Sequence, residues 1–109
     1  MAYHYRCYKT DEFKRSFRKL DHSVQRIIDK AIREILFNKP YESKRLVSPE
    51  LKGKRSLRVK AYRIIFAICE ECRKLNYERL NGCKDCKKHG TDDIMMFMCA
   101  HRKHAYKIR

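Results

Sequence analysis

The feature that most constrains the fold is a long apolar stripe with helical spacing between two polar boundaries. Seven residues form the stripe at three- and four-residue intervals: Val24, Ile27, Ile28, Ala31, Ile32, Ile35 and Leu36. Asp21 or Ser23 would cap the start of this helix, and Pro40 would end it because proline cannot continue a helix. A shorter stripe of Phe13, Phe17 and Leu20 follows Thr10, which is a suitable N-cap. The two stripes predict a helical hairpin.

Patterns typical of β-strands lie on both sides of this hairpin. Residues 3–8 (YHYRCY) are rich in β-formers, and Leu57 and Val59 alternate with basic residues as in a half-buried strand. Residues 62–68 and 93–100 predict two further strands. The chain must pass through both helices between the first strand and the later strands of the sheet. Both helices should therefore cover one face of that sheet. The sequence therefore predicts a single α+β domain over residues 1–109, in which the helical hairpin packs on a mostly antiparallel four-stranded sheet.

The charge of the chain indicates a polyanionic partner. Lys and Arg number 28 against 13 Asp and Glu, which gives a formal net charge of +15. No acidic residue occurs between Glu50 and Glu70, and the last ten residues (AHRKHAYKIR) contain none either. If Leu57 and Val59 face the helices, then strand alternation places Arg58 and Lys60 on the opposite face, and Arg63 joins them there. This open face would suit a phosphate backbone.

The same stretches resemble a known family. The helical hairpin, the stretch LKGKRSLRVKAYRIIFAI and a closing strand followed by HRKHAY are similar to the RelE/ParE toxin superfamily over residues 3–68 and 92–109. The resemblance implies a toxin that cleaves mRNA on the ribosome and is restrained by a cognate antitoxin. It also implies that Lys52 and Lys54 match the basic pair of the RNA-cleaving branch. In that branch Arg63 would match the phosphate-clamping arginine, Arg102 the C-terminal arginine and Tyr106 the base-stacking tyrosine.

Such residues fit the chemistry of RNA cleavage without a catalytic metal. The reaction needs a base for the 2′-hydroxyl, cations on the phosphate and a proton for the departing 5′-oxygen. We expect Lys54 to be the base, with Lys52 as substitute, because neighbouring cations lower the pKa of a lysine. Arg63 would hold the phosphate, and Arg102 or His104 would assist the leaving oxygen. The other basic residues expected to bind nucleic acid are Arg55, Arg58, Lys60, His101, Lys103 and His104.

Four cysteines form a separate motif in the segment between the last two predicted strands. Cys69 and Cys72, then Cys83 and Cys86, make two C-x2-C pairs that are separated by ten residues. Two such pairs suit a structural zinc ion with four thiolates, so residues 69–91 are predicted to form a zinc-knuckle insert. Disulfides or thiols without metal are the alternative. Cys7 and Cys99 are expected to be small buried core residues.

The remaining expectations concern location and competing functions. No apolar stretch approaches the roughly 20 residues that a membrane-spanning helix needs, and the first residues lack the apolar core of a secretory signal. We therefore expect a cytoplasmic protein with no membrane partner. Two other functions stay open: a DNA gyrase poison of the ParE branch, which the same resemblance allows, and a non-catalytic zinc-containing nucleic-acid-binding module. The basic set that includes Arg63 and Arg102 argues against the gyrase poison, because inhibition needs no RNase residues.

Overall fold

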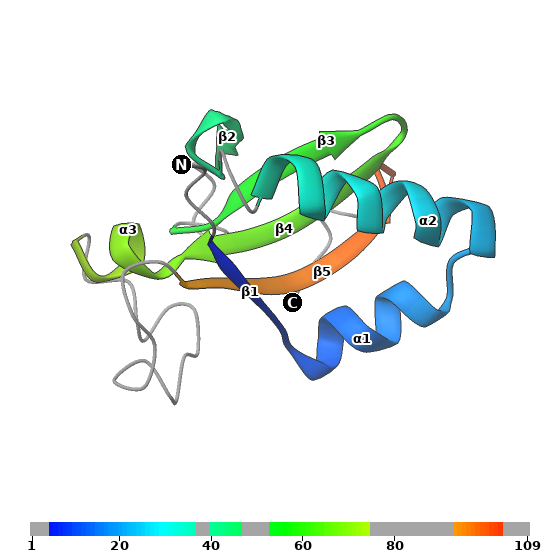
Figure 1. Ribbon diagram of the computed structural model, residues 1–109, viewed down its shortest axis with the longest axis horizontal. Helices are drawn as coiled ribbons and strands as arrows, with labels where there is room; N and C mark the ends of the chain where they lie inside the picture. Colours follow the sequence, from blue (N-terminus) through cyan, green and yellow to red (C-terminus); the bar gives the residue numbers. More distant parts are fainter. Residues whose placement is uncertain (1–4, 37–39, 47–52, 75–92, 104–109) are drawn as a thin grey trace.

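A computed structural model describes residues 5–36, 40–46, 53–74 and 93–103 of the protein. Two helices lie across one face of a sheet, and a short third helix continues one of its strands (Figure 1). The elements in chain order are β1 (Arg6–Lys9), α1 (Asp11–Arg18), α2 (His22–Ala31), the π-helical turn η1 (Ile32–Leu36), the 3-10 turn η2 (Pro40–Glu42), β2 (Lys44–Arg45), β3 (Arg55–Val59), β4 (Tyr62–Ile68), α3 (Cys69–Lys74) and β5 (Asp93–His101).

The helical hairpin begins where the sequence predicts. Thr10 caps α1: its Oγ1 accepts a hydrogen bond from the Phe13 amide at 3.2 Å and donates one to the Met96 carbonyl at 2.9 Å. One side chain therefore starts the helix and ties it to β5. Asp21 takes the N-cap position of α2, without a side-chain cap bond. The stripe of α2 continues into η1, where Ile32 and Leu36 are buried beside Ile28.

The sheet has five strands in the order β1-β5-β4-β3-β2. β1 pairs parallel with β5, and the other neighbours are antiparallel. The prediction of four strands was short by one: β2 pairs only Lys44 and Arg45 with Ser56 and Arg55. Two charged residues in a polar stretch carry no apolar alternation, so the sequence gives no sign of this strand. The mostly antiparallel, two-layer α+β architecture is confirmed.

The core lies between the helices and the sheet, and alternate residues of each strand face it, as expected. Leu57, Val59, Ile64, Phe66 and Ile68 are buried against the helices, together with Cys99. The opposite face is not bare, however. Ile65 and Ala67 point to the other side and are 0% and 2% exposed. The far face therefore has a buried apolar centre, and Arg58 and Arg63 lie beyond it at the β3–β4 hairpin.

Candidate nucleic-acid interface

The β3–β4 hairpin brings two arginines together on the face away from the helices. Arg58 and Arg63 are direct partners in the antiparallel register, and only the pair Val59–Tyr62 separates them from the turn at Lys60 and Ala61. Nη1 of Arg63 donates to the carbonyls of Lys60 at 3.2 Å and Tyr62 at 2.9 Å. These bonds anchor the guanidinium at the turn, beside the exposed side chain of Arg58.

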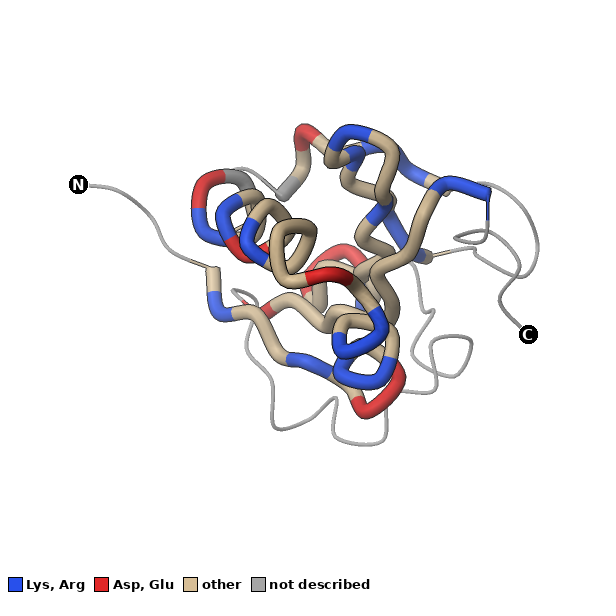
Figure 2. The backbone as a smooth tube through the Cα atoms, turned by 90° about the vertical axis from the view of Figure 1, so that its right-hand side faces the viewer, with Lys and Arg blue, Asp and Glu red and all other residues tan. Residues whose placement is uncertain are grey.

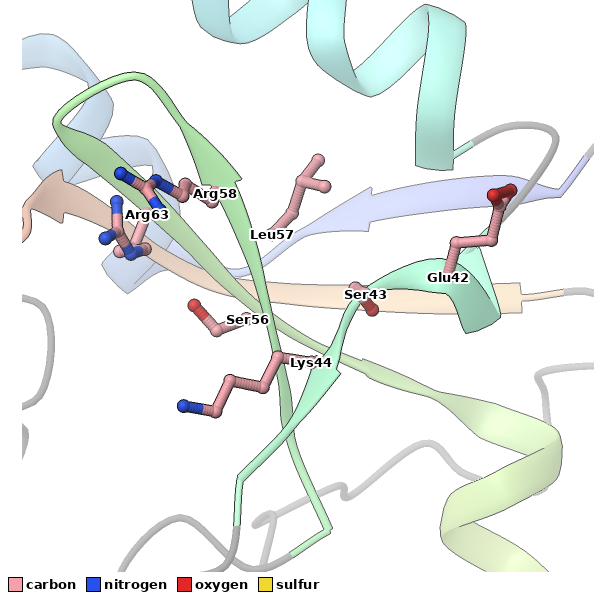
Figure 3. Close-up of a pocket in the computed structure, with 7 residues that line it drawn as sticks. All are labelled: Glu42, Ser43, Lys44, Ser56, Leu57, Arg58 and Arg63. Carbon is pink, nitrogen blue, oxygen red and sulfur yellow. The ribbon is translucent and has the colours of Figure 1, made fainter.

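A pocket of about 460 Å³ lies along β2, β3 and β4 at these arginines, and its lining is Glu42, Ser43, Lys44, Ser56, Leu57, Arg58 and Arg63. Figure 3 shows Lys44, Ser56, Arg58 and Arg63 on one side of the strands, with Glu42 and Leu57 on the other. Three cations from three strands thus border one open pocket. Lys44 was missed from the sequence because its placement depends on the short strand β2.

Charge is unevenly divided between the two layers. Residues 11–34 of the helical hairpin contain seven Lys and Arg and five Asp and Glu, whereas residues 53–63 contain five basic residues and no acid. Figure 2 shows the acidic segments interspersed with basic ones along the helices. The sheet side therefore contributes more of the net positive charge and is the better surface for an anion.

Lys54 lies at the other end of β3, in a less polar setting. It is 8% exposed, and its Nζ lies 5.1 Å from the centre of the Phe97 ring. The ring is there because Phe97 is the extra residue of a bulge, between Met96 paired with Phe66 and Met98 paired with Ile65. Burial lowers the pKa of Lys54. The direction of this shift is the one expected, but its cause is loss of solvent and not repulsion by other cations.

Lys54 and Arg63 do not converge on one point. Arg63 pairs with Arg58, which is four residues from Lys54 along β3, or about 13 Å at the usual rise of a strand. The amine of Lys54 contacts Phe97 while Nη1 of Arg63 binds the turn. A phosphate above Ser56 would lie midway, about 7 Å along the strand from each residue. Both side chains are long enough to reach such a phosphate after leaving their present partners.

Arg55 was expected to bind nucleic acid, but the structure places it elsewhere. It lies in register with Phe66, on the helix-facing side of β3. Its side chain is 9% exposed and forms a two-bond ion pair with Glu71 of α3, at 2.9 Å and 2.6 Å. Arg55 is therefore an internal structural residue, and it is not part of the open face.

The residues after β5 return to the same hairpin. The amide of Arg102 donates to the carbonyl of Ala61 at 2.7 Å, which places exposed Arg102 and Lys103 near the β3–β4 turn. His101 packs edge-on against Tyr62, a residue of the helix-facing side, with ring centres 5.5 Å apart. Its Nδ1 accepts a hydrogen bond from the Lys103 amide. Lys52, His104 and Tyr106 lie outside the described residues.

Comparison with known proteins rests on structure alone. No family model matches the sequence, and no curated protein matches it. The structure is similar to a chain of the crystal structure of the toxin–antitoxin complex RelBE2 from Mycobacterium tuberculosis, with a TM-score of 0.66 over 94% of each chain. The fold is RelE-like. At 19% sequence identity this likeness establishes the fold only.

Within this RelE-like fold, the first half of the cysteine motif is helical. Cys69 and Cys72 are both buried on α3, three residues apart and so on one side of the helix. Cys83 and Cys86 lie outside the described residues. Among the residues described, no three His, Cys, Asp or Glu side chains are grouped as a metal would require. Two neighbouring thiols of α3 are compatible with half of a four-thiolate site.

The two other cysteines behave as core residues. Cys99 is buried and its amide donates to Oγ of Ser16 at 3.1 Å, while Cys7 is partly buried. Burial raises the pKa of Cys7 to about 12 and that of Cys99 to about 11. Both thiols are therefore protonated near neutral pH. None of the described helices is long and apolar enough to cross a membrane.

Proposed function

We propose that this protein is the toxin of a toxin–antitoxin pair and an endoribonuclease that cleaves mRNA on the ribosome. The observation that carries the proposal is the cluster of Lys44, Arg58 and Arg63 around an open pocket on the sheet face opposite the helices. Like charges directly opposite on a sheet destabilise it. An arrangement that costs stability and gathers cations is best explained by an anionic ligand such as an RNA phosphate. The RelE-like fold supports the assignment to a toxin.

The reaction can be assigned to named side chains. The 2′-oxygen attacks the adjacent phosphorus as its proton passes to a base, and the 5′-oxygen leaves with a proton, so a cyclic phosphate remains. Lys54 is proposed as the base, because its lowered pKa makes the neutral amine more accessible near neutral pH. Arg63, with Arg58 beside it, would hold the phosphate oxygens. Arg102 would assist the leaving oxygen and Tyr106 would stack on a base.

The antitoxin should be complementary in charge to this surface. A formal charge of +15, with an acid-free stretch at the β3–β4 hairpin, favours an acidic segment as the inhibitor. Covering Arg58 and Arg63 would block RNA binding directly. Co-expression with neighbouring reading frames should yield a stoichiometric complex with a protein that carries such a segment.

Zinc is proposed as a structural cofactor that is held by Cys69, Cys72, Cys83 and Cys86. The first two thiols are buried together on α3, which suits ligands of a closed site. With four thiolates the ion would have no open position, so its contribution would be to stabilise the fold. No step of the RNA cleavage depends on it.

Translation in a cell lysate tests the function most directly. Adding the protein should stop synthesis, and primer extension should map cuts within codons of translated mRNA. Cuts without ribosomes, or none with intact binding, would refute ribosome-dependent cleavage. Inhibition of gyrase supercoiling without mRNA cuts would favour the ParE-type alternative. RNA binding with neither effect would favour a non-catalytic module.

A further inference from the structure

Arg55, which precedes the pocket residue Ser56 on β3, joins three separate parts of the chain. Besides its ion pair with Glu71 of α3, its Nη1 donates to the carbonyls of Ser43 at 2.8 Å and Tyr41 at 3.3 Å. Its guanidinium also lies 5.1 Å from the centre of the Tyr41 ring. One buried side chain of β3 therefore contacts both α3 and the segment that leads into β2.

This segment forms one wall of the pocket. Ser43 and Lys44 line it directly, opposite Arg58 and Arg63. β2 consists of only two residues, so its ladder with β3 is too short to fix its position strongly. The bonds from Arg55 to the carbonyls of residues 41 and 43 supply the missing restraint, one residue before Lys44.

Helix α3 holds the same segment through a second acid. The hydroxyl of Tyr41 donates to Oε1 of Glu70 at 2.8 Å, and burial together with this bond raises the pKa of Tyr41. Glu70 and Glu71 are adjacent on α3, immediately between Cys69 and Cys72. The cysteine-bearing helix thus contacts the wall of the pocket by two hydrogen-bonded connections.

We propose that Arg55 is a positioning residue for Lys44, and that α3, through Glu71, regulates the RNA-binding pocket that Lys44 completes. The proposal rests on the proposed function, because it takes the pocket to bind RNA. Without the Arg55–Glu71 pair, the guanidinium of Arg55 would be less firmly fixed and would hold the carbonyls of Tyr41 and Ser43 less well. The segment from residue 41 to residue 44 would then be looser, and the Lys44 cation would be less often in place at the pocket. The motif that contains Cys69 and Cys72 would then act on RNA binding without touching RNA.

The direction in which one substitution changes RNA affinity distinguishes a positioning role from a simple effect of net charge. Glu71→Gln makes the protein more positive, so charge alone predicts tighter binding of a single-stranded RNA whose 2′-oxygens are methylated to prevent cleavage. Positioning predicts the reverse: binding about fivefold weaker, as for the loss of one partly exposed ionic contact. The slope of log affinity against log salt concentration should become shallower by about one, as for the loss of one phosphate contact. Glu34→Gln, an exposed acid of η1, is the control and should not weaken binding.

A double-variant cycle shows whether the effect passes through Lys44. Lys44→Ala should weaken binding in the parent protein but have little further effect in the Glu71→Gln background. Lys103→Ala should weaken binding equally in both backgrounds. If Glu71→Gln prevents folding, the pair Arg55→Met with Glu71→Met keeps the volume apolar and gives the same comparison.

The outcomes separate this proposal from the proposed function. Additive effects of Lys44→Ala and Glu71→Gln, or tighter binding by Glu71→Gln, would overturn the positioning role while RNA binding stands. If the parent protein does not bind the methylated RNA, the RNA-binding function fails. Amide hydrogen exchange at Ser43 and Lys44 then decides the positioning role. Exchange at least tenfold faster in the Glu71→Gln variant supports it, and unchanged exchange overturns it.

Discussion

Arg58 and Arg63 lie directly opposite each other on β3 and β4, so two arginine side chains start from neighbouring positions on the same face of the sheet. Like charges directly opposite each other destabilise a strand pair, and the favourable cross-strand pairs contribute about 0.2–1 kcal/mol. Arg58→Thr should therefore stabilise the protein by about 0.5 kcal/mol, since threonine also suits a strand. The same variant should bind RNA more weakly. Denaturant unfolding and RNA titration measure the two effects.

Arg26→Gln is the control, because it removes an exposed arginine that lies on helix α2 and not in the sheet. It should change neither stability nor RNA affinity appreciably. If Arg58→Thr destabilises the protein, the opposed arginines stabilise the fold. Their placement would then not require an anionic ligand to explain it.

The turn between these strands contains a strained residue. Lys60 has a φ of 56°, and it is the one non-glycine residue with positive φ among the residues described. This conformation costs an L-residue about 1–2 kcal/mol and costs glycine almost nothing. Lys60→Gly should thus raise the free energy of unfolding by about 1 kcal/mol, less the extra entropy that glycine gains in the unfolded chain. Ala61→Gly, at the neighbouring position without positive φ, should lower it.

Strand alternation explains which parts of the site were predictable. Leu57 and Val59 were correctly assigned to the core and Arg58 to the open face, because the period of a strand is two. The same rule applied to Arg55 places it with Leu57, so its burial was implicit in the sequence. A run of basic residues, by contrast, predicts exposure, and the two patterns give opposite answers for Arg55. Its partner Glu71, sixteen residues away, could not be inferred from alternation.

Other parts of the site depend on tertiary structure that no local pattern contains. Lys44 reaches the pocket through a two-residue strand, and Phe97 contacts Lys54 because a bulge shifts the alternation of β5 by one residue. His101 pairs with Tyr62 on the helix-facing side for the same reason. The sequence therefore predicted the layers and the basic end of the sheet, but not the distance between Lys54 and Arg63.

The cysteine motif predicts the metal content of the protein. Protein that is purified under reducing conditions should contain about one zinc ion per chain, as four thiolates imply. Cys69→Ser and Cys83→Ser should each reduce the zinc content strongly, whereas Cys7→Ala should not. Chelation should also weaken RNA binding if α3 supports the pocket. Absence of zinc from carefully reduced protein would disprove the site.

Thiol labelling provides a pH-dependent control for this experiment. Burial raises the pKa of Cys99 from 9.0 to about 11 and that of Cys7 to about 12, so alkylation of both in native protein should be slow at pH 8. A raised thiol pKa means that the folded state holds a proton that the unfolded state loses, and stability should fall as pH rises from about 9 to 11. Rapid alkylation of Cys99 at pH 8 would contradict its burial.

The last prediction separates catalysis from attraction of RNA. Arg63→Ala should remove the clamp on the phosphate and slow cleavage about a hundredfold or more. Lys54→Met keeps the length and the contact with Phe97 but cannot accept a proton, so it should slow cleavage similarly with little change in RNA affinity. Lys60→Ala removes an equal charge from the turn and should only weaken binding and flatten its salt dependence.

The measurement is mRNA cleavage on programmed ribosomes, with binding followed separately. Because Lys54 and Arg63 lie about 13 Å apart along the sheet, their joint action on one phosphate requires both side chains to move inward. The double variant should then be no slower than the slower single variant, since the two residues serve one step. If Lys54→Met cleaves at the parent rate while Arg63→Ala does not, the phosphate is cleaved in the Arg58–Arg63 pocket, and the base is a residue other than Lys54.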